Sequence, residues 1–206
     1  MTWKFDSKVA ETFVDHARQH IPNYDRVIDK SIDICKYMLS SDAGIIDVGC
    51  ATGETLRRLH AAGFTNLHGV ESSHAMLQQC DAGIAQYYHS DRFPAKKFDA
   101  VICNWTLHFV EDKVNYLRDM ADSLNTGGIL VVSDKTSKAS LPIHFYHEFK
   151  RNNGVSDTDI QAKEAAVEDI MFINDPKWYL DQLNGHFGKV YIIDASWCFT
   201  SFLCIK

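Results

Sequence analysis

An acidic residue and two glycines lie close together in the stretch I45-I-D-V-G-C-A-T-G-E54. Asp47, Gly49 and Gly53 follow the apolar residues of a short predicted strand and precede the apolar pattern of a helix. A strand, a glycine turn and a helix in this order bring the polypeptide backbone, with its N–H groups, close to a bound ligand. The stretch therefore predicts a ligand-binding turn.

The spacing of this turn distinguishes between two classes of ligand. The dinucleotide pattern is G-x-G-x-x-G, in which the middle glycine admits a pyrophosphate, and residues 49–53 do not have that spacing. Asp47 would repel a pyrophosphate, but it can bond an ammonium group directly or through water. The pattern D-x-G-x-x-x-G therefore favours a nucleoside sulfonium that carries an amino-acid group. A turn with only a structural role is the alternative.

Two further strand ends carry polar side chains. Glu71 ends the segment H68-G-V-E71, about twenty residues after the turn, where an acid can accept both hydroxyls of a ribose. A solvated surface acid is the alternative. Asn104 ends the segment F98-D-A-V-I-C-N104 at the carboxyl edge, where open α/β sheets bind ligands. Three strand ends thus converge on one crevice, and together they predict S-adenosyl-L-methionine (SAM) as the cofactor.

Apolar periodicity predicts an α/β fold in which strands and helices alternate. The expected strands cover 44–48, 66–70, 84–88, 98–103 and 128–133, and the expected helices about 53–62, 73–81 and 111–125, the last ended by Gly127-Gly128. This alternation indicates a mostly parallel sheet with helices on both faces. Residues 188–194 and 197–205 indicate an antiparallel hairpin at the sheet edge.

The chain is expected to form a single domain over 1–206, because it contains no linker and no internal repeat. Its expected parts are an N-terminal helical cap over 1–40, a nucleoside-binding core over 41–134, a helical substrate lid over 135–184 and a closing hairpin over 188–205. In the cap, helical spacing is shown by the apolar residues Phe5, Val9, Phe13 and Ala17.

Composition narrows the classes of function. A net charge of −6 argues against a general binder of nucleic acids or anionic membranes. The charged N-terminus does not resemble a signal peptide, and no apolar run reaches the roughly 18 residues of a membrane span, so we expect a cytoplasmic location. The six cysteines have no C-x-x-C spacing, which predicts reduced and mostly buried thiols. His144, His147 and Glu148 lack the H-E-x-x-H order, and we expect no metal.

Motifs along the whole chain carry a resemblance to a known family. They are F5-D-S-K-V-A10, I21-P-N-Y24, N104-W-T-L-H-F109, S133-D-K135 and H147-E-F-K-R-N-N-G-V-S156. From residue 5 to about 205 the chain resembles the carboxy-S-adenosyl-L-methionine (carboxy-SAM) synthases, a branch of the class I SAM-dependent methyltransferases. The resemblance implies a Rossmann-like class I methyltransferase fold, a seven-stranded sheet with N-terminal helices and a helical insertion before the last two strands.

The resemblance also implies roles for individual residues. The family makes carboxy-SAM from SAM and prephenate for later modification of a wobble uridine in tRNA, and its members pair as homodimers. By resemblance, Tyr24 contacts the amino-acid end of the ligand and Asn104 its centre. The turn residues Gly49, Cys50 and Ala51 form the floor. Glu71 and Ser72 hold the ribose and adenine.

The chain departs from the family at the carboxylate of carboxy-SAM. Gln182 stands where the family has an arginine that grips this carboxylate, and Glu164 replaces a basic residue. A neutral amide cannot replace a bidentate cation, because charge-assisted pairs are about twice as strong. We therefore expect a SAM-dependent methyltransferase acting on a small molecule. A carboxy-SAM synthase and a non-catalytic SAM-binding subunit are the alternatives.

The substrate is expected on the side of the crevice that the insertion covers. Lys135, His147 and Arg151 could meet an anionic substrate, and Trp105 and His108 could shape the pocket. Solvated or core positions are the alternatives for these residues. The sequence does not identify a catalytic base.

Overall fold

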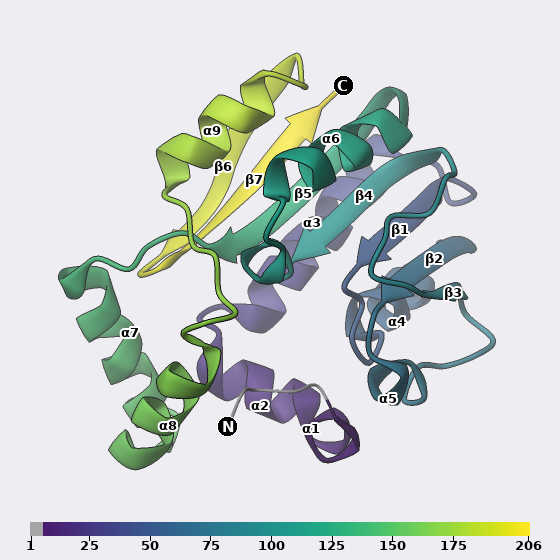
Figure 1. Cartoon of the computed structure of the whole chain (residues 1–206). Coiled ribbons are helices and arrows are strands. Elements are labelled where there is room, and N and C mark those ends of the chain that lie inside the picture. The colour runs from purple at the N-terminus through teal and green to yellow at the C-terminus, as the bar shows by residue number, and fades with distance from the viewer. Residues whose placement is uncertain (1–5) are drawn as a thin grey trace.

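A seven-stranded sheet forms the centre of the protein in a computed structural model that describes residues 6–206 (Figure 1). The strand order is β3-β2-β1-β4-β5-β7-β6. Strand β7 runs antiparallel to β5 and β6, and the other neighbouring strands pair in parallel. The strands are β1 Gly44–Val48, β2 Asn66–Glu71, β3 Gln86–His89, β4 Phe98–Asn104, β5 Leu124–Lys135, β6 Lys189–Ser196 and β7 Phe199–Ile205. The predicted sheet and its edge hairpin are confirmed.

Helices precede, connect and cover the strands. They are α1 Ser7–Glu11, α2 Phe13–His20, α3 Tyr24–Met38, α4 Glu54–Ala61, α5 His74–Leu77, the short 3-10 helix η1 Leu107–Phe109, α6 Lys113–Ser123, α7 Ser140–Asn152, α8 Asp157–Val167 and α9 Pro176–Asn184. The N-terminal helices and the helical insertion lie where the sequence predicts them. Phe5, the first member of the expected periodic pattern, lies outside the described residues.

Helices cover both faces of the sheet. In Figure 1, α6 and α9 lie in front of the sheet, and α3 lies behind it. Successive residues of β1 point to opposite faces, so Ile45 packs with α3 and α4, whereas Ile46 packs with α6 and α9. Both side chains are fully buried. Burying a side chain of this size contributes about 1.5–3 kcal/mol, and the double-sided core therefore holds the strand ends in place.

The glycine pair at 127–128 does not end a helix. Helix α6 ends at Ser123, and the next residue already has extended backbone angles. Leu124 pairs with Phe98 and Ile129 pairs with Ala100, so the residues between form an irregularity in β5. Gly127 has a φ of +78°, and a Cβ on Gly128 would lie 3.0 Å from the carbonyl oxygen of Asp99. The glycines permit this bulge. Helix α5 is likewise shorter than the expected 73–81.

Helix α9 belongs to the core of the domain. Asp175 caps it by accepting a hydrogen bond from the Trp178 N–H, and Pro176 occupies its first turn, as expected for a helix start. Tyr179 and Leu183 are fully buried against the sheet. In Figure 1, α7 and α8 instead lie below the ends of β4 and β5, near α2. Within the expected lid over 135–184, α9 therefore covers the sheet.

The cysteines of the described chain are all free thiols, and only Cys80 is partly exposed. Residues 6–206 contain no cluster of three or more histidine, cysteine or acidic side chains suited to a metal ion. No helix in this part of the chain is both long and apolar enough to cross a membrane.

The position of α9 gives a stability prediction. We expect Leu183→Ala to lower the free energy of unfolding by about 2–5 kcal/mol, because it opens a cavity between α9 and the sheet. Leu141→Ala, the same change at a leucine that is 66% exposed, should change it by less than about 0.5 kcal/mol. Urea denaturation of both variants measures this difference, and equal effects would contradict the core position of α9.

Candidate functional site

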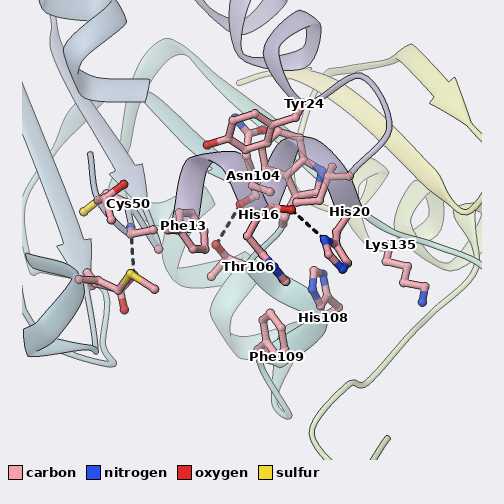
Figure 2. Close-up of a pocket in the computed structure, with 18 of the residues that line it drawn as sticks. Phe13, His16, His20, Tyr24, Cys50, Asn104, Thr106, His108, Phe109 and Lys135 are labelled. Atoms are coloured by element: carbon pink, nitrogen blue, oxygen red, sulfur yellow. Dashed lines mark hydrogen bonds between the residues drawn. The ribbon is translucent and has the colours of Figure 1, made fainter. Parts of the chain in front are cut away.

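A cavity of about 420 Å³ opens at the carboxyl ends of β1, β2, β4 and β5. Helix α2 and residues of α7 and α8 form its other walls. Figure 2 shows Cys50 and Lys135 toward opposite sides of the view, with Asn104, Thr106 and His108 between them. Pockets that hold small molecules have volumes of about 300–1,000 Å³, so the cavity is large enough for a ligand.

The glycine turn after β1 is folded against the end of β2. The N–H groups of Gly49 and Cys50 both donate to the carbonyl oxygen of Val70, at 2.8 and 3.1 Å. The Ala51 N–H donates to Glu71 Oε2 at 3.1 Å. These three N–H groups are therefore used within the protein. The expectation that they face a ligand is wrong at these positions, because closing the turn on β2 satisfies them first.

Gly49 is required by a close neighbour from another strand end. Its φ is +68°, and a Cβ at this position would lie 2.2 Å from Thr106 Oγ1. The Thr106 hydroxyl donates to the carbonyl oxygen of Val48 at 2.9 Å. The turn after β1 therefore contacts the loop after β4 directly, and only glycine leaves room for that contact.

Gly53, a predicted cofactor residue, has another role. It precedes α4 with a φ of +80°, and a Cβ there would lie 3.3 Å from Cys80 Sγ. Gly53 does not line the cavity, whereas Cys50, Ala51 and Thr52 do.

Glu71 lines the cavity while it supports two loops. Its Oε1 accepts from the Ser73 N–H at 2.8 Å, and its Oε2 accepts from the Ala51 N–H. A carboxylate has about four acceptor sites, so Glu71 can still accept hydroxyl donors. Ser72 lies beside it in the cavity wall. The Glu71 carboxylate thus joins the glycine turn to the start of α5, which the solvated alternative does not describe.

Asp47 is a buried carboxyl without a cationic partner among the contacts found in residues 6–206. It is 3% exposed and lines the cavity. Burial raises the pKa of Asp47 to about 7, a hydrogen bond from Thr55 lowers it, and the charge of Glu71 raises it again. An ammonium group placed beside Asp47 would favour its charged form.

Asn104 presents two unpaired polar atoms to the same cavity. The side chain is 8% exposed, and neither its oxygen nor its nitrogen has a hydrogen-bond partner within residues 6–206. Thr52 Oγ1, also in the cavity wall, is buried and unpaired in the same way. Unpaired buried polar groups are rare and costly. These atoms therefore fit a site whose ligand supplies the missing partners.

Two aromatic rings stack on the wall of the cavity. Tyr24 and Trp105 have ring centroids 4.9 Å apart, and both line the cavity. Trp105 has a φ of +56°, an uncommon conformation for a bulky residue, and its N–H donates to the Ser133 carbonyl oxygen at 2.6 Å. Strained residues of this kind cluster at functional sites.

The predicted substrate residues divide into two groups. Lys135 and His108 line the cavity. His147 and Arg151 do not: His147 contacts Glu164, and the exposed Arg151 pairs with Glu148 and Asp157 on the outer face of the insertion. The solvated alternative describes Arg151, whereas His147 is half-buried against Glu164, a residue of the cavity wall. Gln182, on α9, is also absent from the cavity wall.

Several residues of the cavity wall were not expected from the sequence. On α2 they are Phe13, His16 and His20, and on the insertion they are Tyr146, Lys150, Lys163 and Met171. For the residues of α2, the sequence predicts only an amphipathic helix, and that pattern is equally typical of a helix that packs on a core. Lys150 is 2% exposed, an unusual environment for a lysine that periodicity does not reveal.

The chain matches a family of known proteins over most of its length. Residues 18–191 match the sequence model of the methyltransferase domain. The chain belongs to this family. Two solved structures share the methyltransferase fold with it. Magnesium protoporphyrin IX methyltransferase from Synechocystis, with bound S-adenosylhomocysteine, has a TM-score of 0.66 and 13% identity over 91% of this chain and 85% of that one. A putative SAM-dependent methyltransferase from Methanococcus maripaludis has a TM-score of 0.68 and 17% identity. The match covers 100% of this chain and 95% of that one.

The predicted resemblance to one branch of this family is also confirmed. Carboxy-SAM synthase from Actinobacillus pleuropneumoniae serotype 7 is 28% identical over 224 residues, which cover 98% of this chain and 92% of the relative. The enzyme of the same name from Marinobacter nauticus is 29% identical over 225 residues, which cover 99% of this chain and 90% of the relative. This methyltransferase domain is thus similar to those enzymes along its whole length.

The contact between Gly49 and Thr106 gives a second prediction. Gly49→Ala should destabilise the domain by about 1–3 kcal/mol more than Gly154→Ala, because the first meets Thr106 whereas Gly154, also at positive φ (+83°), has nothing within 4 Å. In a double-mutant cycle, Thr106→Ala should offset roughly 0.5–3 kcal/mol of the cost of Gly49→Ala. Denaturant unfolding of the four proteins in the cycle measures this coupling. Additive effects would show that the strand ends do not constrain one another.

Proposed function

We propose that this methyltransferase domain binds SAM in the cavity and transfers its methyl group to a small molecule. The observation that carries the proposal is Asn104, whose two buried polar atoms lack partners within residues 6–206 and which lines the same cavity as Asp47 and Glu71. A ligand with an amino-acid group at one end and a ribose at the other supplies the donors and acceptors for all three. Membership of the methyltransferase family supports the same cofactor.

The arrangement of the wall gives the orientation of the cofactor. Asp47 would hold its ammonium group, with the ring pair of Tyr24 and Trp105 on the same side. Glu71 would accept the ribose hydroxyls, and Ser72 would lie near the adenine. The sulfonium supplies the methyl group. What the protein contributes is alignment of the acceptor with that methyl group and exclusion of water from the cavity.

The far end of the cavity supports an acidic substrate. Lys135 and Lys150 lie 4.9 and 4.1 Å from the ring of Tyr146, and Lys163 lines the same cavity. Burial and the charge of Lys135 lower the pKa of Lys150 to about 8, while burial and Lys150 lower that of Lys163 to about 6. An anion in this space would stabilise the charged lysines. We therefore propose a carboxylate or phosphate on the substrate.

The segment from Lys135 to Met171, which includes α7 and α8, would serve as the cover of the substrate. Its residues supply this end of the cavity wall, whereas α9 packs on the sheet. Pairing into homodimers and a cytoplasmic location stay predictions from the sequence.

A second candidate function is the synthesis of carboxy-SAM, which the full-length similarity to carboxy-SAM synthases favours. Two features of the chain argue against it. Gln182 supplies no positive charge at the position where the resemblance implies an arginine, and it lies outside the cavity of its own subunit. Glu164 stands where the resemblance implies a basic residue. The two functions differ in what they do with SAM and prephenate.

Product analysis separates the two candidates. The purified protein is incubated with SAM and prephenate, and the nucleosides are analysed by mass spectrometry. We expect no product with the mass of SAM plus a carboxyl group. We also expect the wild type to bind SAM more tightly than carboxy-SAM in a competition experiment. Formation of carboxy-SAM at a catalytic rate would make the second candidate the function.

The raised pKa of Asp47 predicts how SAM binding depends on pH. The ammonium group binds the ionised carboxylate, so the affinity should be highest above pH 7 and fall as Asp47 is protonated below it. Calorimetry at pH 7.5 and 5.5 should show about a tenfold loss for the wild type. His16, whose pKa burial lowers to about 4, does not titrate in this window.

Two controls accompany this measurement. In Asp47→Asn, the SAM affinity should be weaker and nearly independent of pH in this range. For the wild type with 5′-methylthioadenosine, which lacks the amino-acid group, the affinity should also change little. A pH dependence that persists in Asp47→Asn would assign it to another residue.

A further inference from the structure

A second buried carboxylate lies beside the cavity, and the cofactor contacts proposed above do not use it. Asp134, near the end of β5, is 0% exposed. One of its oxygens contacts His108 Nδ1, and the other accepts a hydrogen bond from the Tyr179 hydroxyl. Burial, with the charge of Asp134, raises the pKa of Tyr179, so the phenol stays protonated and donates. The carboxylate is thus paired on both sides, as a buried charge requires.

Asp134 determines which nitrogen of His108 carries the proton. A carboxylate accepts hydrogen bonds, so Nδ1 is the protonated nitrogen and Nε2 carries the lone pair. The structure gives Nε2 no hydrogen-bond partner within residues 6–206, and the His108 ring lines the cavity, where Figure 2 shows it with His20 and Lys135. The dyad therefore presents a proton acceptor to the cavity.

The loop around His108 is held rigidly. The Thr106 hydroxyl is anchored on the Val48 carbonyl, and the carbonyl oxygen of His108 accepts from the Phe172 N–H at 2.7 Å. The ring itself lies against Phe109, with centroids 4.3 Å apart and ring planes tilted by 47°. A proton acceptor must be fixed in place to be effective, and His108 is fixed through its backbone and through Nδ1.

The position of His108 is between the two parts of the site. Asn104 and Trp105, four and three residues before it, belong to the wall proposed to hold the cofactor. Lys135 directly follows Asp134 in β5 and belongs to the end proposed to hold the substrate anion. The reacting atoms must lie where these two parts meet.

We propose that His108, oriented by Asp134, accepts the proton of a substrate hydroxyl during methyl transfer. This inference rests on the proposed function. The hydroxyl oxygen bonds to the methyl carbon, the carbon–sulfur bond breaks with its electron pair left on sulfur, and the hydroxyl proton moves to His108 Nε2. Asp134 stabilises the resulting imidazolium, which later releases the proton to water. A hydroxyl gains most from such a base, because it is scarcely ionised near neutral pH, unlike a carboxylate.

Other titratable groups near the dyad affect the choice of measurement. They are Lys113 and Cys103 near Asp134, and His16, His20 and Lys135 in the cavity wall. Burial lowers the pKa of both His16 and His20, so they are neutral over most of the range in which a histidine base acts. Asp47, Lys150 and Lys163 also line the cavity, and their pKa values of about 7, 8 and 6 fall within the same range. The readout of His108 is therefore the part of the pH–rate profile that His108→Gln removes at saturating SAM.

The first test needs no knowledge of the substrate. The protein is saturated with SAM labelled with ¹³C in its methyl group, and nuclear Overhauser effects from this methyl group are recorded. We expect a cross-peak to the ring proton between the two nitrogens of His108, assigned by its loss in His108→Gln. At pH 8, the ring should carry its proton on Nδ1. A bound SAM without this cross-peak, or a proton on Nε2, would overturn the proposal.

The second test measures turnover. Formation of S-adenosylhomocysteine from SAM is followed with fractions of the small molecules of a bacterial extract, between pH 5 and 9. His108→Gln should lower the rate by about 10²- to 10⁴-fold and abolish its rise with pH, while SAM affinity stays within about threefold. Asp134→Asn should move the rising limb to lower pH, because the imidazolium loses its carboxylate. His60→Gln, on the exposed side of α4, is the control and should behave as the wild type.

The outcomes separate this inference from the proposed function. Failure of the wild type to bind SAM would refute the proposed function. Binding of SAM without turnover in any fraction would refute both methyl transfer and the proton acceptor. Turnover that His108→Gln retains within about fivefold, with an unchanged pH profile, would overturn the role of His108 and leave the proposed function standing.

Discussion

The contact between Gly49 and Thr106 fixes two strand ends of the site against one another. It joins the turn after β1 to the loop after β4, and the Thr106 hydroxyl reinforces it by bonding to the Val48 carbonyl at 2.9 Å. The same loop carries the unusual backbone of Trp105 and the short helix with His108, and directly follows Asn104. A packed core on both faces of the sheet keeps the two strand ends at this separation.

Three carboxyl groups near the cavity have different environments, and these explain their different roles. Asp134 is paired by two side chains and needs no ligand. Glu71 is held by two backbone N–H groups and keeps acceptor capacity for a ligand. Asp47 has only a hydroxyl partner, and burial raises its pKa to about 7. A carboxyl that is costly to ionise alone gains most from a bound cation. For this reason the proposed function assigns the ammonium group of SAM to Asp47.

The sequence predicts the parts of this protein that depend on local pattern. Strand ends with polar residues, such as Glu71 and Asn104, follow from alternation and from the rule that ligands bind at the carboxyl edge of a parallel sheet. The glycines at 127–128 were misassigned, because a glycine pair can end a helix or form a bulge, and only the partner strand decides which. Long-range contacts were equally hidden. Nothing in the sequence pattern around Arg151 shows that its side chain is exposed or that the neighbouring Lys150 is buried.

The position of β7 has a consequence for synthesis and folding. Residues 199–205 form an inner strand, between β5 and β6, although they are the last strand of the chain. The sheet therefore cannot close while these residues are still being translated, and until then β5 presents a long, apolar and unpaired edge. Exposed edges of this kind promote association between chains. A chain that stops before residue 199 would keep the glycine turn and most cavity residues, yet be prone to aggregate rather than fold.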